Sequence, residues 1–243
     1  MPYIQDINDF MEKNRPFFGY LKEMEENLKP ISLDEIIKDA GGENKTALIS
    51  VDLIEGFCRT GVLASDRIAG IIPASVELVE KAYNKGIRHI ALVQDSHPDE
   101  ALEFNSFPPH CTKDSEESLS IREFRDLPFY NEMAIITKNS VNSFIDTDLE
   151  KWLMKKALRK IIIIGDCTDL CTYHLAMSLR FFANSMGLPW EVIVPANAVE
   201  TYDMPVDTAK QFGAVPHPGD LMHMIFLYHL MLNGVKVVKS IED

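Results

Sequence analysis

The fold is decided by the stretch Lys160-Ile-Ile-Ile-Ile-Gly165-Asp166-Cys167-Thr168-Asp169-Leu170-Cys171-Thr172. Its β-branched residues run without interruption into Gly165, a pattern typical of a buried parallel strand. A short polar turn follows, and a helical pattern then extends over residues 173–186. The sequence therefore predicts a strand, a turn and a helix, with Cys171 at the N-terminus of the helix.

Cys171 occupies a position at which free backbone N–H groups and the helix dipole favour an anion. Because the thiolate is the reactive form of cysteine, such a position can activate a thiol. The alternative interpretation is a small buried hydrophobic side chain, which is a common role of cysteine. Cys171 is therefore a candidate nucleophile, which would need a base and a cation nearby.

The composition predicts one α/β domain, because 243 residues can bury a full core. A net charge of −13 argues against nucleic acid and anionic membranes as partners. No apolar run approaches the ~20 residues that a membrane helix needs, and no signal peptide is evident. With four cysteines and no secretory signal, we expect reduced thiols in a cytoplasmic protein.

Residues 1–45 precede the first strong strand, and we predict that they form an N-terminal helical extension. Apolar residues recur at helical spacing before Pro30, with an interruption at Pro16. A capping sequence at residues 32–35 opens a second, short helix. We expect these helices to lie on the core, with a separate domain or a dimerisation arm as the alternative. The sequence leaves the formation of a homo-oligomer open.

Predicted strands alternate with predicted helices from residue 46 to residue 243, which indicates a parallel sheet with right-handed crossovers. The predicted strands cover residues 46–52, 87–94, 133–137, 160–165, 190–195 and 235–238. The main predicted helices cover residues 67–85, 147–158, 173–186 and 219–233. The intervening segment 96–132 is rich in proline, serine and charge, and loops of that length are usually functional.

Four reactive side chains lie at or just beyond the ends of predicted strands: Asp52, Asp95, Lys138 and Cys171. Open α/β sheets bind ligands at this edge. Asp52 can accept the thiol proton and return it to a leaving amine, and Lys138 can lower the pKa of the thiol. Taken singly, such an aspartate is often a helix cap and such a lysine is usually solvated. Their joint placement with Cys171 predicts a catalytic group.

The segment after the second predicted strand contains oxygen and nitrogen donors at Asp95, His97, Glu103 and His110. Asp95 and His97 are two residues apart, so their side chains point the same way in an extended chain. Two histidines and two carboxylates suit a site for Zn²⁺, Mn²⁺ or Fe²⁺. The alternative is a polar loop with solvated acids and two surface histidines.

The order Asp52, Lys138, Cys171 resembles that of the isochorismatase-like cysteine hydrolases, and so do the stretches 51–57 and 165–171. The loop Asp95-Ser-His97-Pro, followed by Ser106-Phe-Pro-Pro-His110-Cys111, narrows the resemblance to the nicotinamidases. The likeness covers about residues 46–200, and the loop is its most specific part. It implies a three-layer Rossmann-like fold for residues 46–243, in which helices flank a six-stranded parallel sheet.

The resemblance also implies hydrolysis of a small amide, nicotinamide, to nicotinate and ammonia, a step of NAD salvage. Cys171 would form a thioester, with Asp52 as base and then acid and Lys138 as the orienting charge. A cis peptide bond between Asp166 and Cys167 would accompany an oxyanion hole made by the N–H groups of Cys167 and Cys171.

One divalent metal ion is implied as cofactor, with Zn²⁺ as first choice and Mn²⁺ or Fe²⁺ as alternatives. It would hold the pyridine nitrogen of the substrate. Four residues match the family's ligand positions: Asp95, His97, Glu103 and His110. Glu103 falls at the position that varies within the family. Phe57 and Phe107 match the aromatic residues that sandwich the substrate ring, with packing in the core as the alternative.

Two other functions stay open. One is a metal-free amidase of the same superfamily that acts on another small carboxamide, but such a relative has no reason to keep four metal donors. The other is a non-catalytic binding domain on this fold, against which the complete catalytic group argues. Asp166 departs from the small apolar residues that are common in the family, and residues 112–118 replace a Gly-Thr pair of many members. These departures leave the fine substrate preference open.

Overall fold

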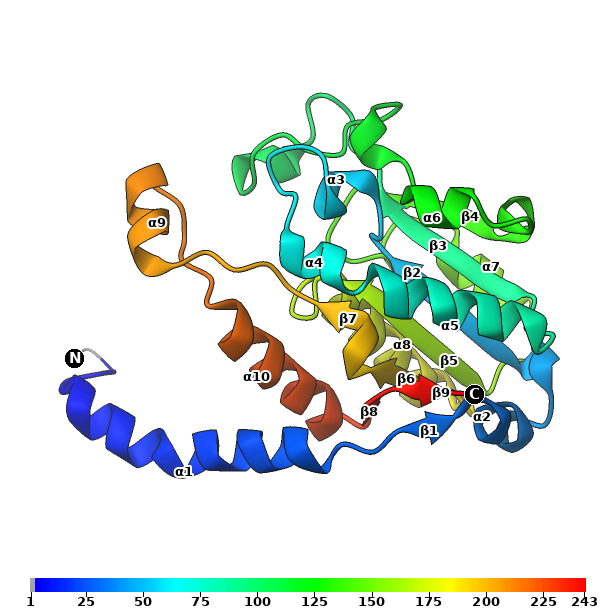
Figure 1. Cartoon of the computed structure of the whole chain (residues 1–243), viewed down its shortest axis with the longest axis horizontal. Coiled ribbons are helices and arrows are strands. Elements are labelled where there is room, and N and C mark those ends of the chain that lie inside the picture. Colours follow the sequence, from blue (N-terminus) through cyan, green and yellow to red (C-terminus); the bar gives the residue numbers. More distant parts are fainter. Residues whose placement is uncertain (1–2) are drawn as a thin grey trace.

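A parallel sheet forms the centre of the computed structural model, which describes residues 3–243 (Figure 1). Its main strands lie in the order β4-β3-β2-β5-β6-β8, and all their pairings are parallel. They are β2 (Thr46–Val51), β3 (His89–Asp95), β4 (Ala134–Lys138), β5 (Lys160–Asp166), β6 (Glu191–Pro195) and β8 (Lys236–Val238). A short strand, β7 (Val199–Glu200), pairs with the end of β5. The predicted α/β fold with a six-stranded parallel sheet is confirmed.

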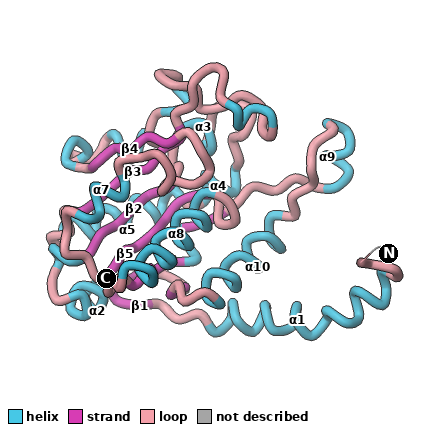
Figure 2. Tube along the Cα trace, turned by 180° about the vertical axis from the view of Figure 1, so that it is seen from behind, coloured by secondary structure: helices cyan, strands magenta, loops and turns pink. Residues whose placement is uncertain are grey.

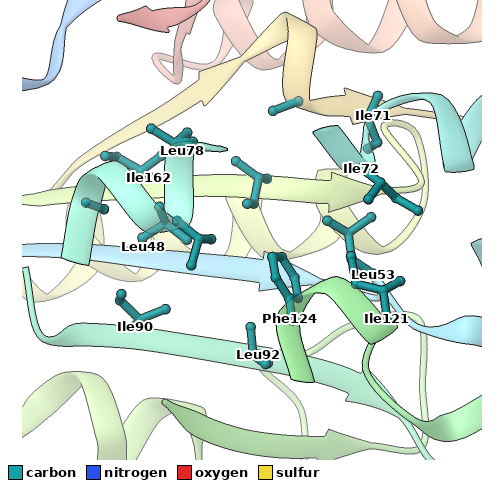
Figure 3. Close-up of a cluster of buried hydrophobic side chains, with 14 of the residues drawn as sticks. Leu48, Leu53, Ile71, Ile72, Leu78, Ile90, Leu92, Ile121, Phe124 and Ile162 are labelled. Carbon is teal, nitrogen blue, oxygen red and sulfur yellow. The ribbon is translucent and has the colours of Figure 1, made fainter. Parts of the chain in front are cut away.

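Helices cover both faces of the sheet, because neighbouring residues of a buried strand point to opposite sides. Leu48 and Ile162 belong to an apolar cluster on one face, shown in Figure 3. Ile49 and Ile163, the next residues along their strands, belong to a second cluster on the other face. The main covering helices are α5 (Ile72–Asn84) for the first cluster and α8 (Cys171–Met186) and α10 (Gly219–Leu232) for the second. Full burial of one such side chain contributes about 1.5–3 kcal/mol, so these layers fix the positions of the strand ends.

Further helices surround this framework. The remaining α-helices are α1 (Ile7–Asn27), α2 (Leu33–Ala40), α3 (Glu55–Cys58), α4 (Asp66–Gly70), α6 (Arg122–Arg125), α7 (Leu149–Met154) and α9 (Val206–Phe212). The 3₁₀ helices are η1 (Glu43–Lys45), η2 (Leu102–Asn105), η3 (Glu116–Ser118), η4 (Tyr130–Glu132) and η5 (Ala196–Ala198). Within residues 3–243, no helix has both the length and the apolar character that a membrane span requires.

The prediction of one helix over residues 67–85 was wrong. The structure divides this segment at Ile71 into α4 and α5, and Pro73 lies in the first turn of α5. Proline lacks the N–H donor that a helix interior needs but suits a first turn, so the second helix begins there. By contrast, α2 begins as predicted, because the Ser32 hydroxyl accepts a hydrogen bond from the Glu35 N–H at 3.3 Å.

The N-terminal helix α1 continues through Pro16, so the predicted interruption was also wrong. Pro16 is exposed, and water can satisfy the carbonyl oxygen that loses its intrahelical donor. Leu21 and Met24 are buried where α1 contacts α10, whereas the first half of α1 extends beyond the core (Figures 1 and 2). The boundary at residue 45 stays a prediction.

Three short strands were missed in the sequence, one of which is β7. The other two are β1 (Ile31–Ser32) and β9 (Ile241–Glu242), which pair in parallel and join the N-terminal extension to the last residues. A two-residue strand has no periodicity that a sequence pattern could reveal. Pairing with β9 ties the segment between α1 and α2 to the edge of the core.

Candidate active site

The ends of three strands and the start of one helix meet at the carboxyl edge of the sheet. Asp52 follows β2, Asp95 and Lys138 end β3 and β4, and Cys171 begins α8. Asp95 and Lys138 are direct partners in the register of β3 and β4. Parallel strands bring their carboxyl ends to one edge, which is why residues so far apart in the sequence become neighbours.

Lys138 lies at the centre of this group. Its Nζ is 2.8 Å from Asp52 Oδ2, 2.5 Å from Asp95 Oδ1 and 3.5 Å from Cys171 Sγ. The side chain is buried, which by itself would lower the pKa of Lys138, but the charges of Asp52 and Asp95 outweigh burial and hold that pKa well above its ordinary value. Lys138 is therefore an ammonium ion shared by two carboxylates and the thiol.

Asp52 is fully buried, and a hydrogen bond holds its carboxylate in place. Its Oδ1 accepts a hydrogen bond from the backbone N–H of Asp95 at 2.8 Å. Burial and the charge of Asp95 raise the pKa of Asp52 to about 6, although Lys138 acts in the opposite direction. At neutral pH Asp52 is therefore mostly a carboxylate, yet it is basic enough to accept a proton.

The thiol of Cys171 is protonated at rest, because burial raises its pKa well above the ordinary value. Lys138 acts to lower that pKa, as predicted, but burial is the larger effect. Cys171 therefore needs a base. A carboxylate oxygen of Asp52 lies within 4.8 Å of the sulfur, so the geometry allows Asp52 to serve as that base.

The end of β5, just before the turn that leads to Cys171, requires glycine. Gly165 has φ 114°, and a Cβ at this position would lie 1.9 Å from the carbonyl oxygen of Val51. The expected cis peptide bond between Asp166 and Cys167 is present. Asp166, the unusual residue of this turn, is buried, and burial raises its pKa well above the ordinary value. Burial therefore disfavours the charged form of the Asp166 carboxyl group.

All four cysteines of the chain are free and buried. Cys58 lies on α3, Cys111 lies in the loop after β3, and Cys167 and Cys171 flank the turn. Burial raises the pKa of Cys58 and of Cys111 as well. Only Cys171 is placed beside both a cation and a carboxylate at these short distances, which separates it from the other thiols.

Beside the group of Asp52, Lys138 and Cys171 lies a set of donors suited to a metal ion. Asp95, His97 and His110 are buried, and their ligand atoms lie within 4.8 Å of one another. The Nδ1 atoms of the two histidines are 2.8 Å from Asn139 Oδ1 and from the carbonyl oxygen of Pro108, which leaves both Nε2 atoms toward Asp95. His97 Nε2 is buried and has no hydrogen-bond partner among the described residues. This donor set fits a divalent metal ion, whose histidine ligands usually have their second nitrogen fixed in this way.

The structure brings together three of the four predicted metal ligands. Glu103 lies on η2, is partly exposed and falls outside the group of donors within 4.8 Å. Its charge still acts on the site. Burial lowers the pKa of His97, but Asp95, Asn139 and Glu103 together raise that pKa above its ordinary value.

Aromatic rings surround the two histidines. The ring centroid of His110 is 5.7 Å from that of Phe57 and 6.2 Å from that of Phe107, the two residues predicted from the sequence. Phe104 was missed, although its ring lies 5.4 Å from His97 and 5.6 Å from His110. Asn139 was also missed, but its position directly after Lys138 could have suggested an outer partner for a ligand histidine.

Comparison with known proteins identifies the family of this chain. The model of the Isochorismatase domain matches residues 46–213, which is more than half of the chain. The chain belongs to the isochorismatase family. The resemblance seen in the sequence is thereby confirmed, and the protein is an isochorismatase-like cysteine hydrolase by family.

Individual relatives agree with this assignment. Nicotinamidase 1 from Arabidopsis thaliana is 27% identical over 216 residues, covering 82% of this chain and 88% of the relative. Pyrazinamidase of Pyrococcus horikoshii, solved in complex with zinc, has a TM-score of 0.62 and 24% identity, covering 80% of this chain and 99% of that one. N-carbamoylsarcosine amidase from Thermoplasma acidophilum has a TM-score of 0.61 and 22% identity, covering 82% and 98%. The two structures share the fold, whereas their substrates differ.

Proposed function

We propose that this chain hydrolyses nicotinamide to nicotinate and ammonia through a thioester on Cys171. One observation carries the proposal: Asp95 belongs both to the donor group with His97 and His110 and to the group around Lys138. A substrate that reaches from one group to the other needs a nitrogen donor and a carboxamide held a short distance apart. Nicotinamide has this form. The nicotinamidase from Arabidopsis supports the choice.

The aromatic side chains suit the substrate ring. Phe57 and Phe107 both lie beside His110, and flat rings pack well against a pyridine ring. With the ring nitrogen toward His97 and His110, the carboxamide points toward Cys171. Burial of the site excludes water, which strengthens its electrostatic interactions.

In the first half of the reaction, Asp52 takes the proton of the Cys171 thiol, and the sulfur attacks the carbonyl carbon. The new S–C bond converts the carbonyl oxygen into an oxyanion, which the N–H groups of Cys167 and Cys171 stabilise. The C–N bond then breaks, Asp52 gives its proton to the leaving nitrogen, and ammonia departs. A thioester remains on Cys171.

In the second half, Asp52 takes a proton from a water molecule, whose oxygen attacks the thioester carbon. The S–C bond breaks, the proton held by Asp52 returns to the sulfur, and the acid product releases its remaining proton to solvent and leaves as nicotinate. Lys138 keeps its charge throughout and holds Asp52 and the sulfur in place. When a divalent ion is held by Asp95, His97 and His110, with Glu103 as the proposed further ligand, it supplies a Lewis acid that polarises the substrate ring. We propose Zn²⁺ as first choice, with Mn²⁺ or Fe²⁺ as alternatives.

Ammonia release from a panel of amides tests this proposal. We expect rapid turnover of nicotinamide and of pyrazinamide, which keeps a ring nitrogen, and slow turnover of benzamide, which lacks one. Equal rates for nicotinamide and benzamide would favour a metal-free amidase. Binding of nicotinamide without any ammonia release would indicate a non-catalytic domain.

A further inference from the structure

Residues from far along the chain anchor the turn that precedes the nucleophile. Asp169 is 4% exposed and lies two residues before Cys171. Its Oδ1 accepts a hydrogen bond from the Thr201 hydroxyl at 2.5 Å, and its Oδ2 lies 2.6 Å from His217 Nε2. Both carboxylate oxygens are therefore bound by groups outside the turn, and neither group belongs to the site described above.

His217 is itself held rigidly. Its Nδ1 lies 2.9 Å from the carbonyl oxygen of Tyr202, and its ring stacks on the Tyr202 ring at 4.0 Å. Its backbone exchanges two hydrogen bonds with Met204, at 2.7 and 2.8 Å. Both ring nitrogens face oxygen atoms, one of Tyr202 and one of Asp169, so the ring is held from both sides. His217 is thus a fixed partner of Asp169.

The backbone of the turn depends on the same region. The Thr168 N–H donates to the carbonyl oxygen of Glu200 at 2.9 Å. Inside the turn, the N–H groups of Leu170 and Thr172 both donate to the carbonyl oxygen of Cys167, at 3.0 and 3.1 Å. The turn is therefore closed around Cys167 and attached to β7 through Glu200.

We propose that His217 and Thr201 are positioning residues for the reaction of Cys171. They hold the Asp169 carboxylate and, through it, the backbone that carries the nucleophile and the N–H groups assigned to the oxyanion. The effect on the reaction rests on the proposed function, whereas the anchoring of the turn does not. Displacement of reacting groups by about 1 Å can cost ~100-fold in rate. The contacts of His217 and Thr201 with Asp169 anchor the turn. Loss of this anchor therefore lowers kcat and leaves KM nearly unchanged, because substrate binding depends on the aromatic rings and the histidines after β3.

Steady-state kinetics of full-length variants on nicotinamide test this effect. We expect His217→Ala to lower kcat by about 10–100-fold with KM within about threefold of the wild type. Thr201→Val keeps the shape of a buried side chain and should lower kcat less. His217→Gln returns an N–H donor and should recover most of the rate. His229→Ala is the control, because His229 contacts Tyr173 at 2.8 Å and does not touch the turn.

A double-mutant cycle shows whether His217 acts through Asp169. If it does, the kcat of Asp169→Ala combined with His217→Ala should equal that of the worse single variant. If the two losses multiply instead, the residues act independently and the proposal is wrong. A loss that appears in KM rather than kcat would also overturn it.

Amide hydrogen exchange of residues 168–172 tests the anchor without any substrate. We expect exchange in this segment to rise at least about tenfold in His217→Ala and to stay unchanged in His229→Ala. Unchanged exchange in His217→Ala would overturn the anchoring. Faster exchange with an unchanged kcat would overturn the link to the reaction. A wild-type chain without activity on nicotinamide would refute the proposed function, and exchange would still decide the anchoring.

Discussion

Replacing Lys138 by methionine removes the buried cation that lies between two buried carboxylates. In the wild type its Nζ is 2.8 Å from Asp52 and 2.5 Å from Asp95, and all three side chains are at most 2% exposed. Removal of one partner from a buried ion pair costs about 3–5 kcal/mol, because it leaves charge without compensation. At ~2–4 °C per kcal/mol for a chain of this size, we expect Tm to fall by about 6–20 °C.

The loss of stability in Lys138→Met should depend on pH in a defined direction. The pKa of Asp52 is about 6 in the wild type, and it rises further when the compensating charge of Lys138 is removed. A group whose pKa is higher in the folded than in the unfolded state makes a stabilising contribution to the free energy of unfolding at low pH. This contribution is lost as pH rises through the folded-state pKa. The variant therefore continues to lose up to about 1.4 kcal/mol per pH unit above pH ~6, where the wild type has levelled off.

Urea denaturation at pH 5 and pH 8, with chelator in every sample, measures this difference. Lys138→Met should be closer to the wild type at pH 5 than at pH 8. Lys160→Met is the matched control, since Lys160 also makes a 2.5 Å ion pair, but with Glu191, which is 35% exposed. We expect that control to lose no more than about 1 kcal/mol. A loss for Lys138→Met of under about 1 kcal/mol at pH 8, or one independent of pH, would refute the reasoning.

Three further predictions follow from the site and the turn. Cys171→Ala should lower ammonia release by ~10⁴-fold or more with an unchanged circular dichroism spectrum, and near-normal turnover would remove it as the nucleophile. Chelation should reduce turnover and added Zn²⁺ should restore it, whereas full activity in protein free of metal by elemental analysis would refute the metal proposal. Phe107→Ala should raise KM about tenfold in steady-state assays, and an unchanged KM would assign the ring to packing alone.

Much of the fold could be predicted from the sequence, because it follows from local sequence patterns. Apolar β-branched runs such as residues 160–165 are typical of buried strands, and helices between them favour parallel pairing. Once the pairing is parallel, the positions of Asp52, Lys138 and Cys171 at one edge follow without knowledge of any distance. The predicted interruption at Pro16 and the predicted single helix over residues 67–85 were wrong for one reason, because the effect of a proline depends on its place in the helix and on solvent access.

The rest depends on contacts that no local pattern records. Glu103 has the right chemistry for a metal ligand, but the fold of the loop decides whether it reaches the donor group. The pairing of β1 with β9 joins residues at opposite ends of the chain. The attachment of Asp169 to His217 spans 48 positions and joins a turn to a segment with no periodic signal. Such contacts appear only when the chain has folded.

Because every cysteine is buried, chemical modification of the thiols can measure local opening of the protein. A thiol reagent that reacts slowly compared with reclosing modifies each cysteine in proportion to the population of the state that exposes it. Cys58 and Cys111 would report separation of α3 from the loop after β3, and Cys171 would report movement of the turn. Mass spectrometry of the four peptides after one exposure to reagent would therefore rank these openings by free energy. Saturation with substrate should slow the reaction at Cys171 more than the reaction at Cys58.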